Sequence, residues 1–194
     1  MALNEFSQAV QALAGEADLE IRGPRSGFDE ATYARIAGLP EVAVASPVLE
    51  VEARLPGRQE TLRVLGMDAF RAAYVQPGLV GHAPADMLDL LRSDALFLSP
   101  AAADWLGAKA GDRLNVQVGL SAVSLRVAGL LHGSGRERLG VMVIAAAQWA
   151  LARLGSINRI DLRLRPGVDA LALRARLQGE LPSGLIAERP QSDV

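Results

Sequence analysis

The feature that most constrains this fold is a strand–helix–strand pattern that occurs twice, once near each end of the chain. In the first copy, apolar and charged side chains alternate over 18–22, which is typical of a strand with one buried face. Asp29 then stands where it can cap a short helix that ends near Gly38. The segment 42–55 is predicted to be extended, with Pro47 marking an edge or a bulge.

The second copy of the pattern occupies the last forty residues or so of the chain. Apolar side chains alternate with charged ones over 159–165, which again predicts a one-sided strand. Asp169 follows a Pro-Gly turn and is placed to cap a helix with leucines along one face. The segment 185–187 can form a final strand.

Two strand–helix–strand units predict an α/β (α+β) fold built from both ends of the chain. A helix that crosses over between parallel strands is the expected connection, and two such units can share one sheet. We therefore expect a discontinuous, porter-like α/β subdomain made from 16–68 and 156–190. This prediction fails if the strands at 18–22 and 159–165 lie in different sheets.

The intervening segment, 69–155, has short strands with small helices at their corners and is predicted to be an inserted β-rich subdomain. Within it, Ser99 precedes a proline and is expected to cap a helix that stops at Gly107. Gly111 allows a turn conformation closed to other residues, and Asp112 is expected to accept hydrogen bonds from the amides that follow it. That pair is explained by the turn and requires no catalytic role.

The first fifteen residues carry an apolar stripe and predict an amphipathic helix that stops at Gly15. Two interpretations stay open: the helix packs on the domain, or it continues a membrane helix of a longer protein. We expect the native protein to continue at both ends into apolar stretches of about 20 residues. In that case the domain would lie outside the cytoplasmic membrane.

Composition and charge disfavour several classes of function. The formal net charge is −2, with acidic and basic residues interleaved, whereas a nucleic-acid-binding domain normally has a basic patch. The longest uncharged stretch, 139–152, is shorter than the ~20 residues that span a bilayer. The chain has no cysteine, so disulfides and thiolate metal sites are excluded.

No catalytic or metal-binding constellation is predicted. His82 and His132 have no partners at ligand spacing, so no metal site is expected. Ser99 lacks the surroundings of a nucleophilic serine and is explained as a helix cap. Trp105 and Trp149 fall on apolar helix positions and are expected to pack in the core. We accordingly predict no enzyme activity, no cofactor and no bound metal or nucleotide.

A glycine-rich segment, 133–138, separates two predicted strands and is interpreted as a flexible hairpin tip. No helix follows it to direct amides at a phosphate, which disfavours an anion cradle. Its charged residues, Arg136, Glu137 and Arg138, are predicted to be unpacked and to contact a partner. Reversing the charges of the two arginines should then weaken partner capture without lowering the melting temperature.

Three stretches together resemble the extracytoplasmic core domain of MacB-like and FtsX-like ABC transporter permeases. The first is LFLSPAAADWLGAKAGDRLNVQV with LRVAGLL, at 96–118 and 125–131. The others are LPEVAVASPVLE at 39–50 and AAAQWALARLGSINRIDLRLRPGVD at 145–169. The order of these motifs covers nearly the whole chain. Glu41 departs from the family pattern, in which glycine is commoner.

The resemblance implies a non-catalytic domain, inserted after the first transmembrane helix, that faces the periplasm or cell exterior from the inner membrane. A separate ATP-binding subunit hydrolyses ATP, and the domain moves with that hydrolysis to handle a lipoprotein, peptide or small-molecule cargo. A periplasmic adaptor, chaperone or lipoprotein is the implied partner, and nucleic acid is not. The alternative is a small-molecule-binding sensor or an enzyme whose site lies between the two subdomains.

Overall fold

A computed structural model describes residues 17–68, 92–131 and 136–190 of the 194-residue chain. Four helices occur in these ranges: α2 (Ala31–Ala37), α5 (Pro100–Leu106), α6 (Ile144–Ala150) and α7 (Ala170–Glu180). The strands are β1 (Leu19–Arg22), β2 (Phe28–Asp29), β3 (Val42–Arg54), β4 (Thr61–Met67), β5 (Ala95–Leu98), β6 (Arg113–Val118), β7 (Ser121–Leu130), β8 (Leu139–Val143), β9 (Ser156–Ile157), β10 (Arg159–Leu164) and β11 (Ile186–Glu188).

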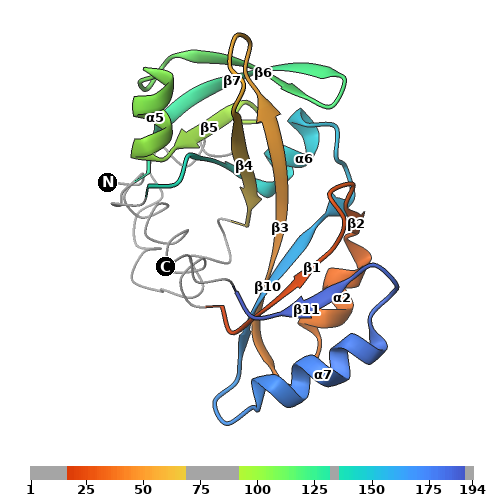
Figure 1. Cartoon of the computed structure of the whole chain (residues 1–194). Coiled ribbons are helices and arrows are strands. Elements are labelled where there is room, and N and C mark those ends of the chain that lie inside the picture. Colours follow the sequence, from red (N-terminus) through yellow and green to blue (C-terminus); the bar gives the residue numbers. More distant parts are fainter. Residues whose placement is uncertain (1–16, 69–91, 132–135, 191–194) are drawn as a thin grey trace.

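Nine of the strands form one sheet in the order β11-β1-β10-β3-β4-β8-β5-β7-β6, and β2 pairs with β9. The molecule is thus a mixed α/β protein, as the sequence predicts (Figure 1). The amphipathic segment 1–15, the predicted helix at 85–92 except its last residue, and both histidines lie outside the described residues.

The two strand–helix–strand units interleave in one part of this sheet. β10 lies between β1 and β3 and is antiparallel to both, so β1 and β3 are parallel but not adjacent. In the same way β1 lies between β10 and β11 and is antiparallel to both. Each unit therefore fills the gap in the other, which is the split β-α-β arrangement. The prediction that the strands at 18–22 and 159–165 share a sheet is confirmed.

Helices α2 and α7 pack on one face of these four strands. Leu19 lies opposite Leu162, and Ile21 lies opposite Ile160, so alternate positions of β1 and β10 present apolar side chains to the helices. Burying a side chain of this size stabilises a fold by roughly 1.5–3 kcal/mol. The core of this part contains, among others, Leu19, Ile21, Ile36, Ala45, Ile160, Leu162, Leu173 and Leu177.

Strand β3 continues into the rest of the sheet (Figure 1). Its first half pairs with β10, and its second half, from Val48 on, pairs with β4. At the far end of the sheet a single pair, Arg54 opposite Gln117, joins β6 back to β3 and closes the six strands on themselves. A second core fills this barrel and includes Leu49, Val51, Leu62, Val64, Leu98, Leu125, Val127, Ala102 of α5 and Ala147 of α6.

The division into a subdomain of 16–68 with 156–190 and an insert of 69–155 stays a prediction. Within the described residues, β4, which belongs to the predicted porter-like subdomain, pairs with β8 of the predicted insert as well as with β3. Pro47 lies in β3 one residue before the pairing with β4 begins, so the strand has a paired neighbour only on its β10 side there. This placement agrees with the exclusion of proline from the fully paired interior of sheets.

Several local predictions for helix ends and turns are confirmed. Ala102 N–H donates to Ser99 Oγ at 3.1 Å at the start of α5, and Gly107 ends that helix with φ +63°. Gly111 has φ +95°. The prediction for Asp112 is wrong in direction, because its Oδ2 accepts from Lys109 N–H, which precedes it, at 2.9 Å. The side chain folds back over the turn that the bond from Asp112 N–H to Lys109 C=O closes.

The predicted hairpin before β8 is wrong. β7 and β8 are both paired with β5, which lies between them in the sheet, so these two strands do not pair with each other as a hairpin. The predicted core position of Trp149 is also wrong, because 67% of this residue is exposed. Helix α6 instead buries Ala146 and Ala147 against the sheet. It approaches so closely that an added Cβ on Gly66 of β4 would lie 2.7 Å from Ala147 Cβ.

This close approach predicts a cost for Gly66→Ala. The added methyl group would force α6 away from β4 or distort the strand, and overpacking of this kind typically costs about 1–3 kcal/mol. Gly179→Ala in α7 is the matched control, because its new methyl group meets nothing within 4 Å and should be neutral or stabilising. Urea denaturation of both variants measures the difference, and equal stabilities would contradict the packing described here.

Candidate functional site: a charged face on the shared sheet

The face of the sheet opposite α2 and α7 carries charged residues from several strands. We call it the charged face and define it by Glu20, Arg22, Glu50, Arg63, Glu137, Arg159, Asp161 and Glu188. In β1 and β10, the alternation that points leucines and isoleucines at the helices points Glu20, Arg22, Arg159 and Asp161 the other way. The one-sided pattern predicts that such charges are solvated. Yet the side chains of Arg159 and Asp161 are only 10% and 5% exposed.

Arg159 lies in the buried part of this face. Its Nη1 donates to Glu50 Oε2 at 3.0 Å, and its Nη2 donates to Asp161 Oδ2 at 3.3 Å. Its Nε also lies 2.8 Å from Asp161 Oδ1, but these two atoms are not aligned for a hydrogen bond. The guanidinium thus holds two carboxylates by charge, while part of its hydrogen-bonding capacity is unused.

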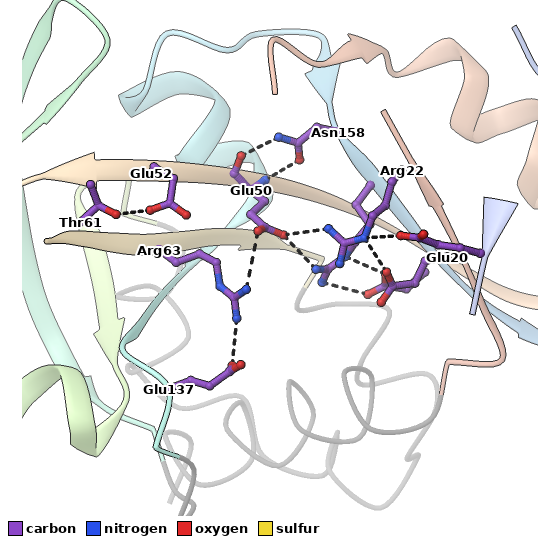
Figure 2. A network of polar contacts seen from close by, with 11 residues as sticks. Glu20, Arg22, Glu50, Glu52, Thr61, Arg63, Glu137 and Asn158 are labelled. Carbon is purple, nitrogen blue, oxygen red and sulfur yellow. Dashed lines mark hydrogen bonds and ion pairs between the residues drawn. The ribbon is translucent and has the colours of Figure 1, made fainter. Parts of the chain in front are cut away.

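The Glu50 carboxylate lies between arginines that come from different strands of the charged face (Figure 2). Besides Arg159, its carboxylate lies 3.7 Å from Arg22 Nη1 and 3.8 Å from Arg63 Nη1. Arg22 also pairs with Glu20 at 2.9 Å on its own strand. Arg22 further pairs with Glu188 of β11 at 3.0 Å. One carboxylate on β3 therefore holds arginines from β1, β4 and β10.

The side chain of Asn158 forms hydrogen bonds with the backbone of β3 at Glu50 (Figure 2). Its side-chain Oδ1 accepts from Glu50 N–H at 2.7 Å, and its Nδ2 donates to Glu50 C=O at 2.6 Å. The register between β10 and β3 ends at Val48. The amide of Asn158 thereby extends the pairing beyond the ladder by supplying the donor and the acceptor that a further strand residue would supply.

Burial sets the ionisation behaviour of the central pair. Burial raises the pKa of Asp161 above its ordinary value, Arg159 opposes that rise, and Glu20 adds to it. For Arg159, burial alone would lower the pKa, but the charges of Asp161, Glu20 and Glu50 raise it overall. Arg159 therefore stays charged, and Asp161 accepts a proton more readily than an exposed aspartate.

The raised pKa of Asp161 predicts a pH dependence of stability. Since the folded state holds this proton more tightly, the stabilisation from protonated Asp161 is present below its ordinary pKa of 3.8 and is lost as the pH rises through the higher folded pKa. Asp161→Asn removes this titration. The free energy of unfolding of the wild type, measured relative to this variant by urea denaturation from pH 3.5 upward, should fall with rising pH. A constant difference would contradict the prediction.

The residues predicted to contact a partner are exposed, and two of them contact neighbouring side chains. Glu137 Oε2 accepts from Arg63 Nη2 at 3.0 Å (Figure 2). The backbone C=O of Glu137 accepts from Ser99 Oγ at 2.7 Å. Arg138 pairs with Glu60 and lies 4.8 Å from the centre of the Trp105 ring. Both residues are exposed in spite of these contacts, and their contact with a partner stays a prediction. Arg136 is exposed, and its contact with a partner stays a prediction.

The chemistry available on the charged face is that of paired ions. Nucleophile–base pairs of the kind used in acyl transfer do not occur among the eight residues that define it. No group of three or more His, Cys, Asp or Glu residues is placed to hold a metal ion within 17–68, 92–131 and 136–190. In the same ranges no helix has the length and apolar character needed to cross a bilayer.

The fold has the architecture found in extracytoplasmic parts of ABC-type transporters. The periplasmic region of MacB from Actinobacillus actinomycetemcomitans has a similar structure, with a TM-score of 0.57 and 10% identity over 93% of this chain and 92% of that chain. The extracellular domain of the noncanonic ABC-type transporter YknZ from Gram-positive bacteria gives a TM-score of 0.53 and 13% identity, over 88% of this chain and 99% of that one. At such identities these matches show a shared fold.

The family itself is identified by sequence. The family model described as MacB-like periplasmic core domain matches residues 2–180, so this chain belongs to that family. It is a periplasmic or extracellular domain of a MacB-like ABC transporter. The resemblance seen in the sequence motifs is thereby confirmed. A search of curated proteins found no match.

Proposed function

We propose that this domain is non-catalytic and couples the ATP-driven motion of its transporter to the handling of cargo outside the cytoplasmic membrane. ATP is hydrolysed in a separate ATP-binding subunit that acts through the membrane part. The cargo is a lipoprotein, a peptide or a small molecule, received through contacts with a periplasmic adaptor, chaperone or lipoprotein. The observation that carries this proposal is the single strand β3 that belongs to both cores.

A shared strand makes the two parts of the domain move together. β3 is hydrogen-bonded to β10 over its first half and to β4 over its second. The Asn158 amide and the Glu50 carboxylate add cross-links where the pairing changes sides. A displacement at one part is therefore transmitted to the other instead of being taken up by a hinge at this point. A domain whose two parts move as one rigid body can transmit a displacement from the membrane to a site farther from it.

The alternative, a sensor or enzyme with a site between the two parts, has less support. The polar side chains that converge where β3 passes from one core to the other are largely paired with one another, as Arg159 with Glu50 and Asp161 shows. A ligand would have to break these pairs in order to bind. We therefore retain the transport proposal.

Distance measurements in the complete transporter test the proposal. The chain has no cysteine, so Leu120→Cys and Leu171→Cys introduce unique spin-label sites in this domain, at residues that are 102% and 55% exposed. We expect the distance between these two labels to stay constant when nucleotide binds. The distance from Leu120 to a label on the membrane part should change. A nucleotide-dependent change between the two labels within the domain, or ATP turnover by the isolated domain, would refute the proposal.

Charge reversal separates the proposed partner contact of Arg136 from the ion pair that Arg138 makes with Glu60. Arg136→Glu should weaken partner capture without lowering the melting temperature, because Arg136 is exposed. Arg138→Glu should lower the melting temperature, since it loses the pair with Glu60 and the contact with the Trp105 ring, which contribute about 1 kcal/mol together. Arg35→Glu on exposed α2 is the control. Unchanged capture by the Arg136 variant would remove this segment from the interface.

A further inference from the structure

The nine-stranded sheet has two ends in its strand order, and they differ in what lies beyond them. At one end, β6 is joined back to β3 through the pair of Arg54 and Gln117. At the other end, β11 is the last strand and has only β1 as a paired neighbour within the described residues. The outer side of such a strand presents backbone donors and acceptors that can pair with a strand of another molecule.

The outward backbone groups of β11 belong to alternate residues. In an antiparallel pair, successive residues direct their N–H and C=O alternately toward the neighbouring strand and away from it. Ala187 lies opposite Ile21 of β1, yet its N–H and C=O both bond to side chains of α7. They therefore point away from β1, and so does the C=O of Leu185, two residues earlier. These three groups are the ones that another strand would use.

Two side chains of α7 already occupy all three groups. Gln178 Oε1 accepts from Ala187 N–H at 2.9 Å, and Gln178 Nε2 donates to Leu185 C=O at 3.1 Å. Arg174 Nε donates to Ala187 C=O at 3.0 Å. The Gln178 amide thus offers one acceptor and one donor, as the backbone of a paired strand does, and the Arg174 guanidinium supplies the second donor.

Helix α7 holds these side chains at the edge without making them part of the core. Leu173 and Leu177 are its buried residues and fix it against the sheet. Arg174 and Gln178 each follow one of these leucines, so they lie one helical turn apart on the side of the helix next to β11. Both residues are exposed. Replacing them by alanine therefore removes the bonds to β11 without opening a cavity in the core.

We infer that Gln178 and Arg174 close the β11 edge against a second copy of this chain. Two identical edges are self-complementary, because antiparallel pairing about a two-fold axis lets each Ala187 exchange both of its bonds with its counterpart. Ile186 is 54% exposed and would add an apolar contact to such a pair. Exposed apolar edge strands are the ones that associate in this way. This inference does not depend on the proposed function.

The double variant Arg174→Ala with Gln178→Ala tests the inference by sedimentation equilibrium of the whole chain. Pairing through three residues is weak, so concentrations up to roughly 1 mM are used. The average mass of the double variant should rise with concentration beyond that of the wild type. Arg176→Ala is the matched control, because it removes the same charge from α7 but pairs with Glu41 instead of β11. Equal association of the wild type and the double variant would overturn the inference.

Two further measurements show whether β11 is the surface that pairs. In dilute Gln178→Ala, the Ala187 N–H should exchange with solvent about tenfold faster, because it has lost its acceptor. Spin labels on Ile186→Cys, in the double variant, should broaden each other's spectra at high concentration, since diagonal neighbours on paired strands lie about 7–8 Å apart. Labels on Leu154→Cys, a residue 67% exposed after α6, should not. Association without broadening at residue 186, or exchange of Ala187 at the wild-type rate, would contradict the closed edge.

Discussion

Replacing Arg159 with methionine is expected to lower the free energy of unfolding by about 3–5 kcal/mol. The Arg159 side chain is 10% exposed and is held between Glu50 and Asp161. Methionine fills a similar volume but leaves Asp161, which is only 5% exposed, without its positive partner. An unpaired buried carboxylate either stays charged at high cost or takes up a proton. Both outcomes destabilise the fold at neutral pH.

A double variant separates the loss of charge pairing from the loss of packing. Arg159→Met with Asp161→Leu removes both members of the central pair and should recover a large part of the lost stability, because no unpaired aspartate remains. Arg35→Met on the exposed surface of α2 is the control and should change stability by less than about 0.5 kcal/mol. Urea denaturation at pH 7 gives all three values. A loss below about 1 kcal/mol for Arg159→Met would show that the charged face contributes little to the fold.

Asn158→Ala should cost about 2–4 kcal/mol. The substitution leaves both Glu50 N–H and Glu50 C=O without the partners that Asn158 supplies at 2.7 and 2.6 Å. Each buried backbone group that loses its partner costs about 1–3 kcal/mol. The loss should also loosen the connection between the two cores, since these bonds lie where β3 changes its pairing partner. Hydrogen exchange at Glu50 N–H should therefore become faster in the variant.

Asn158→Asp is the matched control for this pair of hydrogen bonds between the Asn158 side chain and the Glu50 backbone. Ionised aspartate can accept from Glu50 N–H but cannot donate to Glu50 C=O, so the variant should be destabilised at pH 7. Protonated aspartate regains a donor. The stability of Asn158→Asp relative to Asn158→Ala should accordingly rise as the pH is lowered through the pKa of the new carboxyl group. A difference in the free energy of unfolding that does not change with pH would argue against the proposed role of these two hydrogen bonds.

Local features of the fold follow from the sequence because they depend on neighbours within a few residues. The cap of α5 by Ser99 and the cap of α7 by Asp169 each join groups two or three residues apart. The period-two patterns at 18–22 and 159–165 likewise determine which side chains face a core, once a strand has formed. The family resemblance rests on the order of such local elements along the chain.

The candidate site depends on tertiary structure, because its contacts join residues far apart in the chain. Arg159 and Glu50 are 109 residues apart, and Arg63 and Glu137 are 74 apart. A strand with one apolar and one charged face has the same sequence pattern whether its charged face is solvated or buried in ion pairs. The interleaved order of the two units decides which charges become neighbours, and no periodicity encodes that order. The sequence by itself thus determined the elements and the family, and the tertiary structure alone determined where the charges meet.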